Sequence, residues 1–179
     1  MERDYKAHLE TGAPFVRDIL IISGGGAKGA FGAGFLQGWE SVTGATALPV
    51  FDVVTGVSTG ALIAPFAFIG TEEAYTSVAD FYANPGENWV RKRGLNTMTQ
   101  SLQLFAMHLL HEIVKDYQET EGMDVEFRWV AIPEDAPKPA TTAMFDKDYM
   151  LALEDLGRKM GADPSIWKTD VPLVYSFEN

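Results

Sequence analysis

The sequence contains no cysteine, and this absence excludes several kinds of site. The chain can form no disulfide, no thiolate metal site and no cysteine nucleophile. It also lacks any apolar run near the roughly 18 residues that span a bilayer. The first ten residues are mostly charged or polar and contain no apolar core of a signal peptide. From these features we expect a cytoplasmic protein.

Positive charge is scarce. There are 14 Lys and Arg residues against 25 Asp and Glu, a formal net charge of −11. Such an acidic surface argues against binding nucleic acid and against electrostatic attraction to anionic membranes, although an apolar lipid substrate remains compatible with it. With 179 residues, of which 46% are hydrophobic, the chain can bury one core. We therefore predict a single domain over residues 1–179.

The segment from residue 51 to 70 carries the clearest signal. Its β-branched start predicts a buried strand, and its apolar second half predicts a helix. Between them lies Gly-Val-Ser-Thr-Gly, and G-x-S-x-G between a strand and a helix is the pattern of a nucleophile elbow. Gly56 and Gly60 leave room for the sharp turn, and Ser58 would be strained and exposed at the helix N-terminus. The alternative is a turn in which Ser58 only caps the helix.

A second strand–turn–helix unit precedes this one. Residues 18–23 form an aliphatic run typical of a buried parallel strand. A glycine-rich loop, residues 24–29, follows directly and leads into a predicted helix that ends near residue 40. Small residues at helical spacing, Gly34 and Gly38, would let this helix lie close against a sheet. A right-handed crossover would bring both turns to the same end of one parallel sheet.

The glycine loop has more than one interpretation. Gly24-x-Gly26-x-x-Gly29 matches the dinucleotide fingerprint, but the next strand has Asp52 at its start and no acidic residue at its end to hold a ribose. An oxyanion hole is the second interpretation, because a glycine loop at a helix N-terminus presents free backbone N–H groups. Lys28 would add a positive charge suited to a phosphate. A tight turn with an exposed lysine is the third.

Together the two motifs, Ser-Gly-Gly-Gly-Ala-Lys-Gly-Ala-Phe-Gly-Ala-Gly and Phe-Asp-Val-Val-Thr-Gly-Val-Ser-Thr-Gly-Ala, resemble the patatin-like phospholipase family over residues 17–70. The resemblance implies an α/β fold with a parallel sheet, related to the α/β-hydrolases, and hydrolysis of lipid acyl esters with transient contact at a membrane surface. It implies a Ser–Asp dyad without histidine and no metal or organic cofactor. It makes Ser58 the nucleophile, Gly24, Gly25 and Gly26 the oxyanion hole, and Lys28 the basic residue of the loop.

The sequence departs from the family at the aspartate. The family's aspartate lies in an Asp-Gly-Gly or Asp-Gly-Ala motif, and this chain contains no Asp-Gly dipeptide. We interpret the chain as a truncated domain, with a motif-bearing half at 17–94 joined to a C-terminal segment at 95–179. Missing strands would leave apolar surface and favour self-association. The alternatives to a hydrolase are a non-catalytic remnant or interaction module and, less favoured, a nucleotide-binding domain.

The C-terminal segment offers few site residues. A helix is predicted over 96–121, in which His108 and His111 could be metal ligands, a base for Ser58 or part of a solvated face. The alternation after residue 122 predicts a strand over 123–131. The residues that could replace the missing aspartate as a base are Asp80, Asp146, His108 and His111.

The chain then returns to loop and helix. Residues 134–140 are rich in proline and predict a loop. A last helix is predicted from residue 147 to 160, capped by Asp146 and closed by Gly161.

Overall fold

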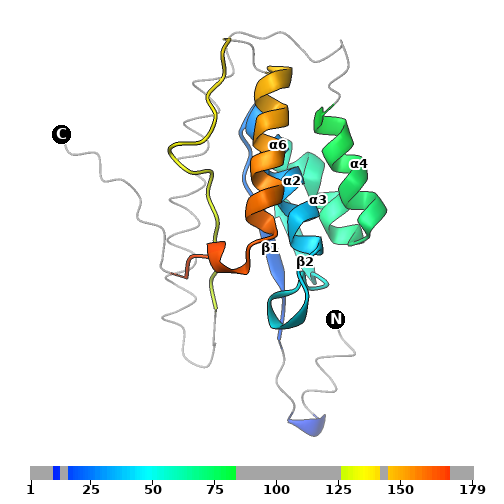
Figure 1. Cartoon of the computed structure of the whole chain (residues 1–179). Coiled ribbons are helices and arrows are strands. Elements are labelled where there is room, and N and C mark those ends of the chain that lie inside the picture. Colours follow the sequence, from blue (N-terminus) through cyan, green and yellow to red (C-terminus); the bar gives the residue numbers. More distant parts are fainter. Residues whose placement is uncertain (1–9, 13–15, 84–125, 142–144, 170–179) are drawn as a thin grey trace, which may run out of the picture.

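The structure is a computed structural model that describes residues 10–12, 16–83, 126–141 and 145–169. Two parallel strands and the helices packed on them form the described part (Figure 1). In chain order the elements are β1 (Ile19–Ile22), the 3₁₀ turn η1 (Gly26–Lys28), α2 (Gly29–Glu40), η2 (Gly44–Thr46), β2 (Val53–Gly56), α3 (Thr59–Ile69), α4 (Glu72–Ala83), α6 (Lys147–Gly161) and η3 (Pro164–Ile166).

The sheet joins the two strands that precede the motifs. Strands β1 and β2 are parallel neighbours, with Ile19 opposite Val53 and Ile22 opposite Gly56. The prediction that both strands belong to one parallel sheet is therefore confirmed. At their amino ends, Asp52 accepts hydrogen bonds from the Arg17 side chain at 3.2 Å and from the Asp18 amide at 3.1 Å. These bonds hold the starts of the strands together.

The two faces of the sheet differ in burial. Leu20, Ile22 and Val54 pack against the buried core that the helices form. On the opposite face, the side chains of Ile19 and Ile21 are 58% and 52% exposed. The described helices thus cover one face of the sheet. Ile19 and Ile21 are exposed apolar residues of β1. The expectation that strands are missing beside β2 stays a prediction.

Helices α2 and α6 pack backbone against backbone, side by side in Figure 1. A Cβ added at Gly38 would lie 2.0 Å from the Arg158 carbonyl oxygen, and one added at Gly161 would lie 2.1 Å from the Phe35 carbonyl oxygen. Glycine is therefore required on both helices. Our prediction that Gly34 and Gly38 let this helix approach a sheet is wrong, because their open face receives α6 instead. A Cβ added at Gly32 would lie 3.3 Å from the Ile63 side chain of α3 and 3.9 Å from the Ile22 side chain of β1.

The C-terminal predictions have mixed outcomes. Helix α6 is confirmed, and Asp146 caps it by accepting a hydrogen bond from the Tyr149 amide at 3.1 Å. The predicted strand over 123–131 is wrong for its described part, residues 126–131. There Trp129 forms only an isolated antiparallel bridge with Lys168. The segment has alternating hydrophobic residues, but among the described residues no strand pairs with it along its length. The loop over 134–140 is confirmed. The predicted helix over 96–121 lies outside the described residues.

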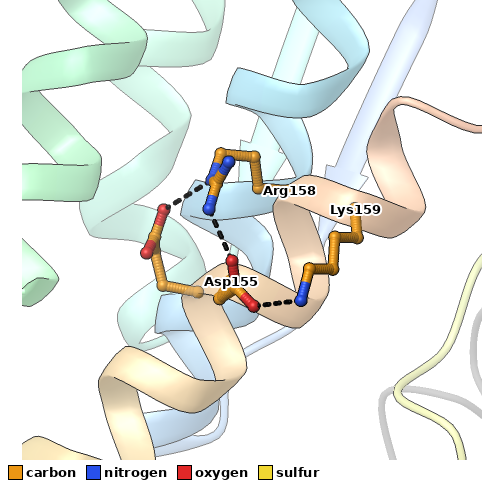
Figure 2. Close-up of polar contacts among 4 residues, drawn as sticks. Asp155, Arg158 and Lys159 are labelled. Carbon is orange, nitrogen blue, oxygen red and sulfur yellow. Dashed lines mark hydrogen bonds and ion pairs between the residues drawn. The ribbon is translucent and has the colours of Figure 1, made fainter.

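The exposed side of α6 carries a short chain of charges (Figure 2). Asp155 accepts from Arg158 and forms an ion pair with Lys159, while Arg158 also pairs with Glu154. These pairs are three or four residues apart, the spacing that stabilises a helix surface.

In the part of the chain that the structure describes, no helix has the length and apolar character needed to cross a membrane.

Candidate active site

The glycine loop begins where β1 ends. Gly25 has a φ of 150° and Gly26 a φ of 58°, values that L side chains rarely adopt. These two glycines turn the chain sharply from the strand into η1. Lys28 follows them with an exposed side chain, and none of the ion pairs in the described part involves it. The loop therefore brings backbone and one unpaired cation to the carboxyl end of the sheet.

Ser58 adopts the strained conformation that the elbow motif predicts. Its φ is 55° and its ψ is −120°, and it is the only non-glycine residue with positive φ in the described ranges. It is the N-cap residue of α3, yet its side chain makes no capping hydrogen bond. The alternative in which Ser58 merely caps the helix therefore lacks its defining contact. The residue is exposed.

The two glycines beside Ser58 are required by sterics. A Cβ at Gly56 would lie 2.3 Å from the Gly60 carbonyl oxygen, and a Cβ at Gly60 would lie 2.3 Å from the Ile22 carbonyl oxygen. The turn thus closes on itself and on the end of β1. The prediction that these flanking positions need residues without side chains is confirmed.

The glycine loop and the elbow are in contact. A Cβ at Gly24 would lie 2.8 Å from the Ser58 Cβ and 2.6 Å from the Val57 carbonyl oxygen. Both turns therefore lie at the same end of the sheet, as the two strand–turn–helix units predict. By contrast, Asp52 lies at the amino end of β2, bound to Arg17. The loop has no acidic residue from this strand beside it, which weakens the dinucleotide interpretation.

Helices α2, α3 and α6 all begin at this end of the molecule. Helix α3 starts directly after Ser58, and α2 starts directly after the glycine loop. Helix α6 runs parallel to α2, because Gly34 meets Glu154 and Gly38, one turn later, meets Arg158. Helix N-termini carry partial positive charge. This arrangement favours a negative charge near the two turns.

The carboxylates considered as a base have other partners. Both oxygens of Asp146 accept hydrogen bonds, from the Tyr149 amide and from the Thr141 hydroxyl at 2.7 Å. These bonds lower the pKa of Asp146, that from Thr141 most, which makes it a weaker base. Asp80 is exposed on α4, where its charge contributes to raising the pKa of Glu154, an effect that comes mainly from burial of the Glu154 carboxyl. His108 and His111 lie outside the described residues.

Tyr82 was not among the residues predicted for the site. Its side chain is fully buried, and its hydroxyl donates a hydrogen bond to the Thr59 carbonyl at 3.2 Å. Burial raises the pKa of Tyr82 to about 12, so the hydroxyl stays protonated. The signal in the sequence was only a stripe of apolar residues along α4, which indicates a core position and does not reveal the contact with the elbow.

A shallow groove of about 360 Å³ runs between β2 and α3, the two elements that flank Ser58. Apolar atoms of Ala64, Pro65 and Phe68 line it. Helix α3 carries no charged residue, and the side chains of Phe68 and Ile69 are 59% and 61% exposed. The groove exposes polar as well as apolar atoms, and most of its apolar side chains come from α3.

A comparison with family models decides the family. The model of the patatin-like phospholipases matches residues 20–151, more than half of the chain. The chain belongs to the patatin-like phospholipase family. Membership places it among lipid hydrolases at the level of the family and agrees with the parallel strands and helices described above.

One curated relative in the family is similar over a short segment. The cUMP-AMP-activated phospholipase of Escherichia coli is 43% identical over 54 residues, which are 30% of this chain and 17% of that protein. The chain thus matches well under two thirds of the length of this patatin-like relative. No solved structure matches the chain.

Proposed function

We propose that this chain is a lipid acyl hydrolase domain in which Ser58 is the nucleophile. The observation that carries the proposal is the φ of 55° and ψ of −120° at Ser58. Strained backbone of this kind costs about 1–3 kcal/mol and concentrates at catalytic sites. Membership of a phospholipase family supplies the class of substrate, an acyl ester of a lipid.

The proposed reaction has two steps. Ser58 Oγ attacks the acyl carbonyl carbon, and the alcohol leaves with the serine proton. Water then attacks the acyl-serine, which releases the fatty acid and returns a proton to Ser58. Backbone N–H groups of Gly24, Gly25 and Gly26 would stabilise the tetrahedral oxyanion. Lys28 would attract the phosphate of a headgroup.

The acyl chains would lie on the apolar surface beside Ser58. This surface combines the groove between β2 and α3 with the exposed side chains of Phe68 and Ile69. A hydrocarbon chain gains about 0.8 kcal/mol for each methylene that it buries, so such a surface favours long acyl chains over short ones.

Within the described residues, no side chain is placed as a general base for Ser58. No Asp-Gly dipeptide occurs in the sequence, and the Ser58 side chain makes no capping hydrogen bond. A serine hydroxyl without a base is a weak nucleophile. The same observation favours a second candidate function, a non-catalytic member of the fold that acts as an interaction module.

Covalent labelling distinguishes the two candidates. A fluorophosphonate probe reacts when Ser58 Oγ displaces fluoride from phosphorus, and intact-mass measurement counts the adducts without requiring turnover. We expect one adduct on the chain, lost in Ser58→Ala. The matched control is Ser77→Ala, because Ser77 is an exposed serine on α4 whose hydroxyl donates to the Glu73 carbonyl. Absence of labelling at Ser58 in the unmodified chain would support the interaction module instead.

A further inference from the structure

Tyr82 contacts the residues that follow the two turns of the candidate site, Thr59 after Ser58 and Gly29 at the end of the glycine loop. Its hydroxyl is 3.2 Å from the carbonyl oxygen of Thr59, the residue directly after Ser58. Its ring also lies against Gly29, the residue with which α2 begins after the glycine loop. A Cβ at Gly29 would lie 2.6 Å from the Tyr82 hydroxyl oxygen and 2.8 Å from the carbon that carries it. One side chain therefore spans the starts of α2 and α3.

The contact with Tyr82 explains why residue 29 has no side chain. Gly29 has a φ of −57° and a ψ of −29°, ordinary helical values that alanine adopts without strain. A glycine is therefore not required by the backbone at this position. The three atoms nearest to a Cβ added at Gly29 all belong to Tyr82. The sixth position of the glycine motif is thus occupied by glycine because the phenol ring fills the site of its Cβ.

The surroundings of Tyr82 hold it in one place. The side chain is fully buried, and its ring meets that of Phe81 edge to face with centroids 5.6 Å apart. Thr59 is also buried. A fully buried phenol with one hydrogen bond has few alternative rotamers, because interiors are close-packed. Tyr82 therefore links α4 to the starts of α2 and α3.

We infer that Tyr82 is a positioning residue that sets the distance between Ser58 and the glycine loop. The inference rests on the proposed function, since that distance matters for catalysis only if Ser58 is the nucleophile. An oxyanion needs donors roughly 3 Å away, and small errors in that placement strongly lower the rate of the chemical step. Tyr82 acts through Thr59 and Gly29 and does not itself touch the substrate.

The first test compares two tyrosines on one helix. Tyr82→Phe removes only the hydroxyl that binds Thr59. Tyr75→Phe is the matched control, because Tyr75 is also buried on α4 but its hydroxyl lies near Gly70, at the other end of α3. Hydrogen exchange measured by mass spectrometry reports on the loop directly and needs no activity. We expect faster exchange over residues 24–29 and 58–63 in Tyr82→Phe, and unchanged exchange there in Tyr75→Phe.

The second test uses the rate of Ser58 labelling by the fluorophosphonate probe. Tyr82→Phe should lower the rate constant of the covalent step about tenfold, the size of effect that one hydrogen bond produces, while the probe's binding constant stays the same. Tyr75→Phe should leave both values unchanged. A purely structural loss would instead lower the melting temperature of both variants and leave the labelling constants of correctly folded protein alike.

A double-mutant cycle tests the contact at Gly29. Gly29→Ala should slow labelling and speed loop exchange in the presence of Tyr82. The same substitution in a Tyr82→Leu background should have a much smaller effect, because the obstructing ring is gone. Equal effects in both backgrounds would show that Tyr82 does not position the loop.

The outcomes separate the two proposals. Equal loop exchange in Tyr82→Phe and Tyr75→Phe would overturn the role of Tyr82, whether or not Ser58 is labelled. Unlabelled Ser58 in the unmodified chain, with faster loop exchange in Tyr82→Phe alone, would overturn the hydrolase proposal. In that case the spacing role of Tyr82 would stand as a property of the fold.

Discussion

Gly34 in α2 and Glu154 in α6 pack so closely that a Cβ at Gly34 would lie 2.1 Å from the Glu154 carbonyl oxygen. Gly157 makes the reciprocal contact, 2.2 Å from the Phe31 carbonyl oxygen. Gly34 and Glu154 are 120 residues apart in the sequence. Their contact is therefore a tertiary feature that joins the C-terminal helix to the motif-bearing half.

This relationship predicts a selective loss of stability. Gly34→Ala should lower the free energy of unfolding by about 1–3 kcal/mol, because overpacking against a backbone oxygen forces the helices apart. Gly32→Ala is the control on the same helix, since its Cβ would meet only the ends of two side chains, Ile63 at 3.3 Å and Ile22 at 3.9 Å, and no backbone atom within 4 Å. Denaturant unfolding of both variants measures the difference. Equal stability of the two would contradict the observed packing.

Strain at Ser58 predicts an unusual order of stability. Ser58→Gly should be more stable than Ser58→Ala by about 1 kcal/mol, because glycine adopts positive φ without the steric cost. At Ser41, where φ is −72°, the order should be reversed. Thermal unfolding of the four variants checks this. Finding alanine more stable at both positions would show that the backbone at Ser58 is relaxed.

The charges on α6 predict opposite responses to pH. Burial raises the pKa of Glu154, so the folded state holds its proton more strongly and loses stability as the pH rises above 4.5, the ordinary value for glutamate. Glu154→Gln should therefore lose less stability than the unmodified chain between acid and neutral pH.

Asp155 should respond in the opposite direction. The hydrogen bond from Lys159 is the main cause that lowers the pKa of Asp155. Its contribution to the stability of the folded state is therefore present at neutral pH and is lost as the pH falls. Asp155→Asn should reduce stability at neutral pH and have little effect in acid. Melting temperatures across this range would reject the assignment if both variants shifted in the same direction.

The exposed apolar surface predicts self-association. Residues 53–70 carry no charge, although the chain has a net charge of −11. Copies can therefore meet at this surface without opposing charges, and burial of Phe68 and Ile69 would stabilise a dimer or larger assembly. Phe68→Glu should shift the chain toward monomer in sedimentation velocity. Val16→Glu, at a 74% exposed position outside that surface, is the control. A monodisperse monomer before any substitution would refute the prediction.

Turnover is predicted to be slow even if Ser58 is labelled. Loss of one member of a catalytic triad leaves about 10³ to 10⁴-fold catalysis over water, which the oxyanion hole and binding supply. Hydrolysis of a short-chain ester should therefore be barely above background, with Ser58→Ala at background. A robust rate that Ser58→Ala abolishes would show that another residue acts as the base.

The two strands and the turns after them were determined locally. Aliphatic runs that end in glycine predict strand followed by sharp turn, and the required conformations at Gly25, Gly26 and Ser58 depend on neighbours within a few residues or on the adjacent strand. The family followed from the same short segments, because their spacing is specific. Helix α6 and its cap at Asp146 were also predictable, since capping involves residues three apart.

Only the tertiary structure decided which surfaces meet. The glycines of α2 predict a helix face that allows close approach, but a sheet or a second helix can pack on such a face. In the structure it is α6 that packs there. The contact of Tyr82 with Thr59 and Gly29 joins three segments, and no local pattern specifies it. The exposure of Ile19 and Ile21 in β1 likewise depends on which other parts of the chain pack on that face. Propensity acts over neighbouring residues, whereas burial and contact depend on the whole chain.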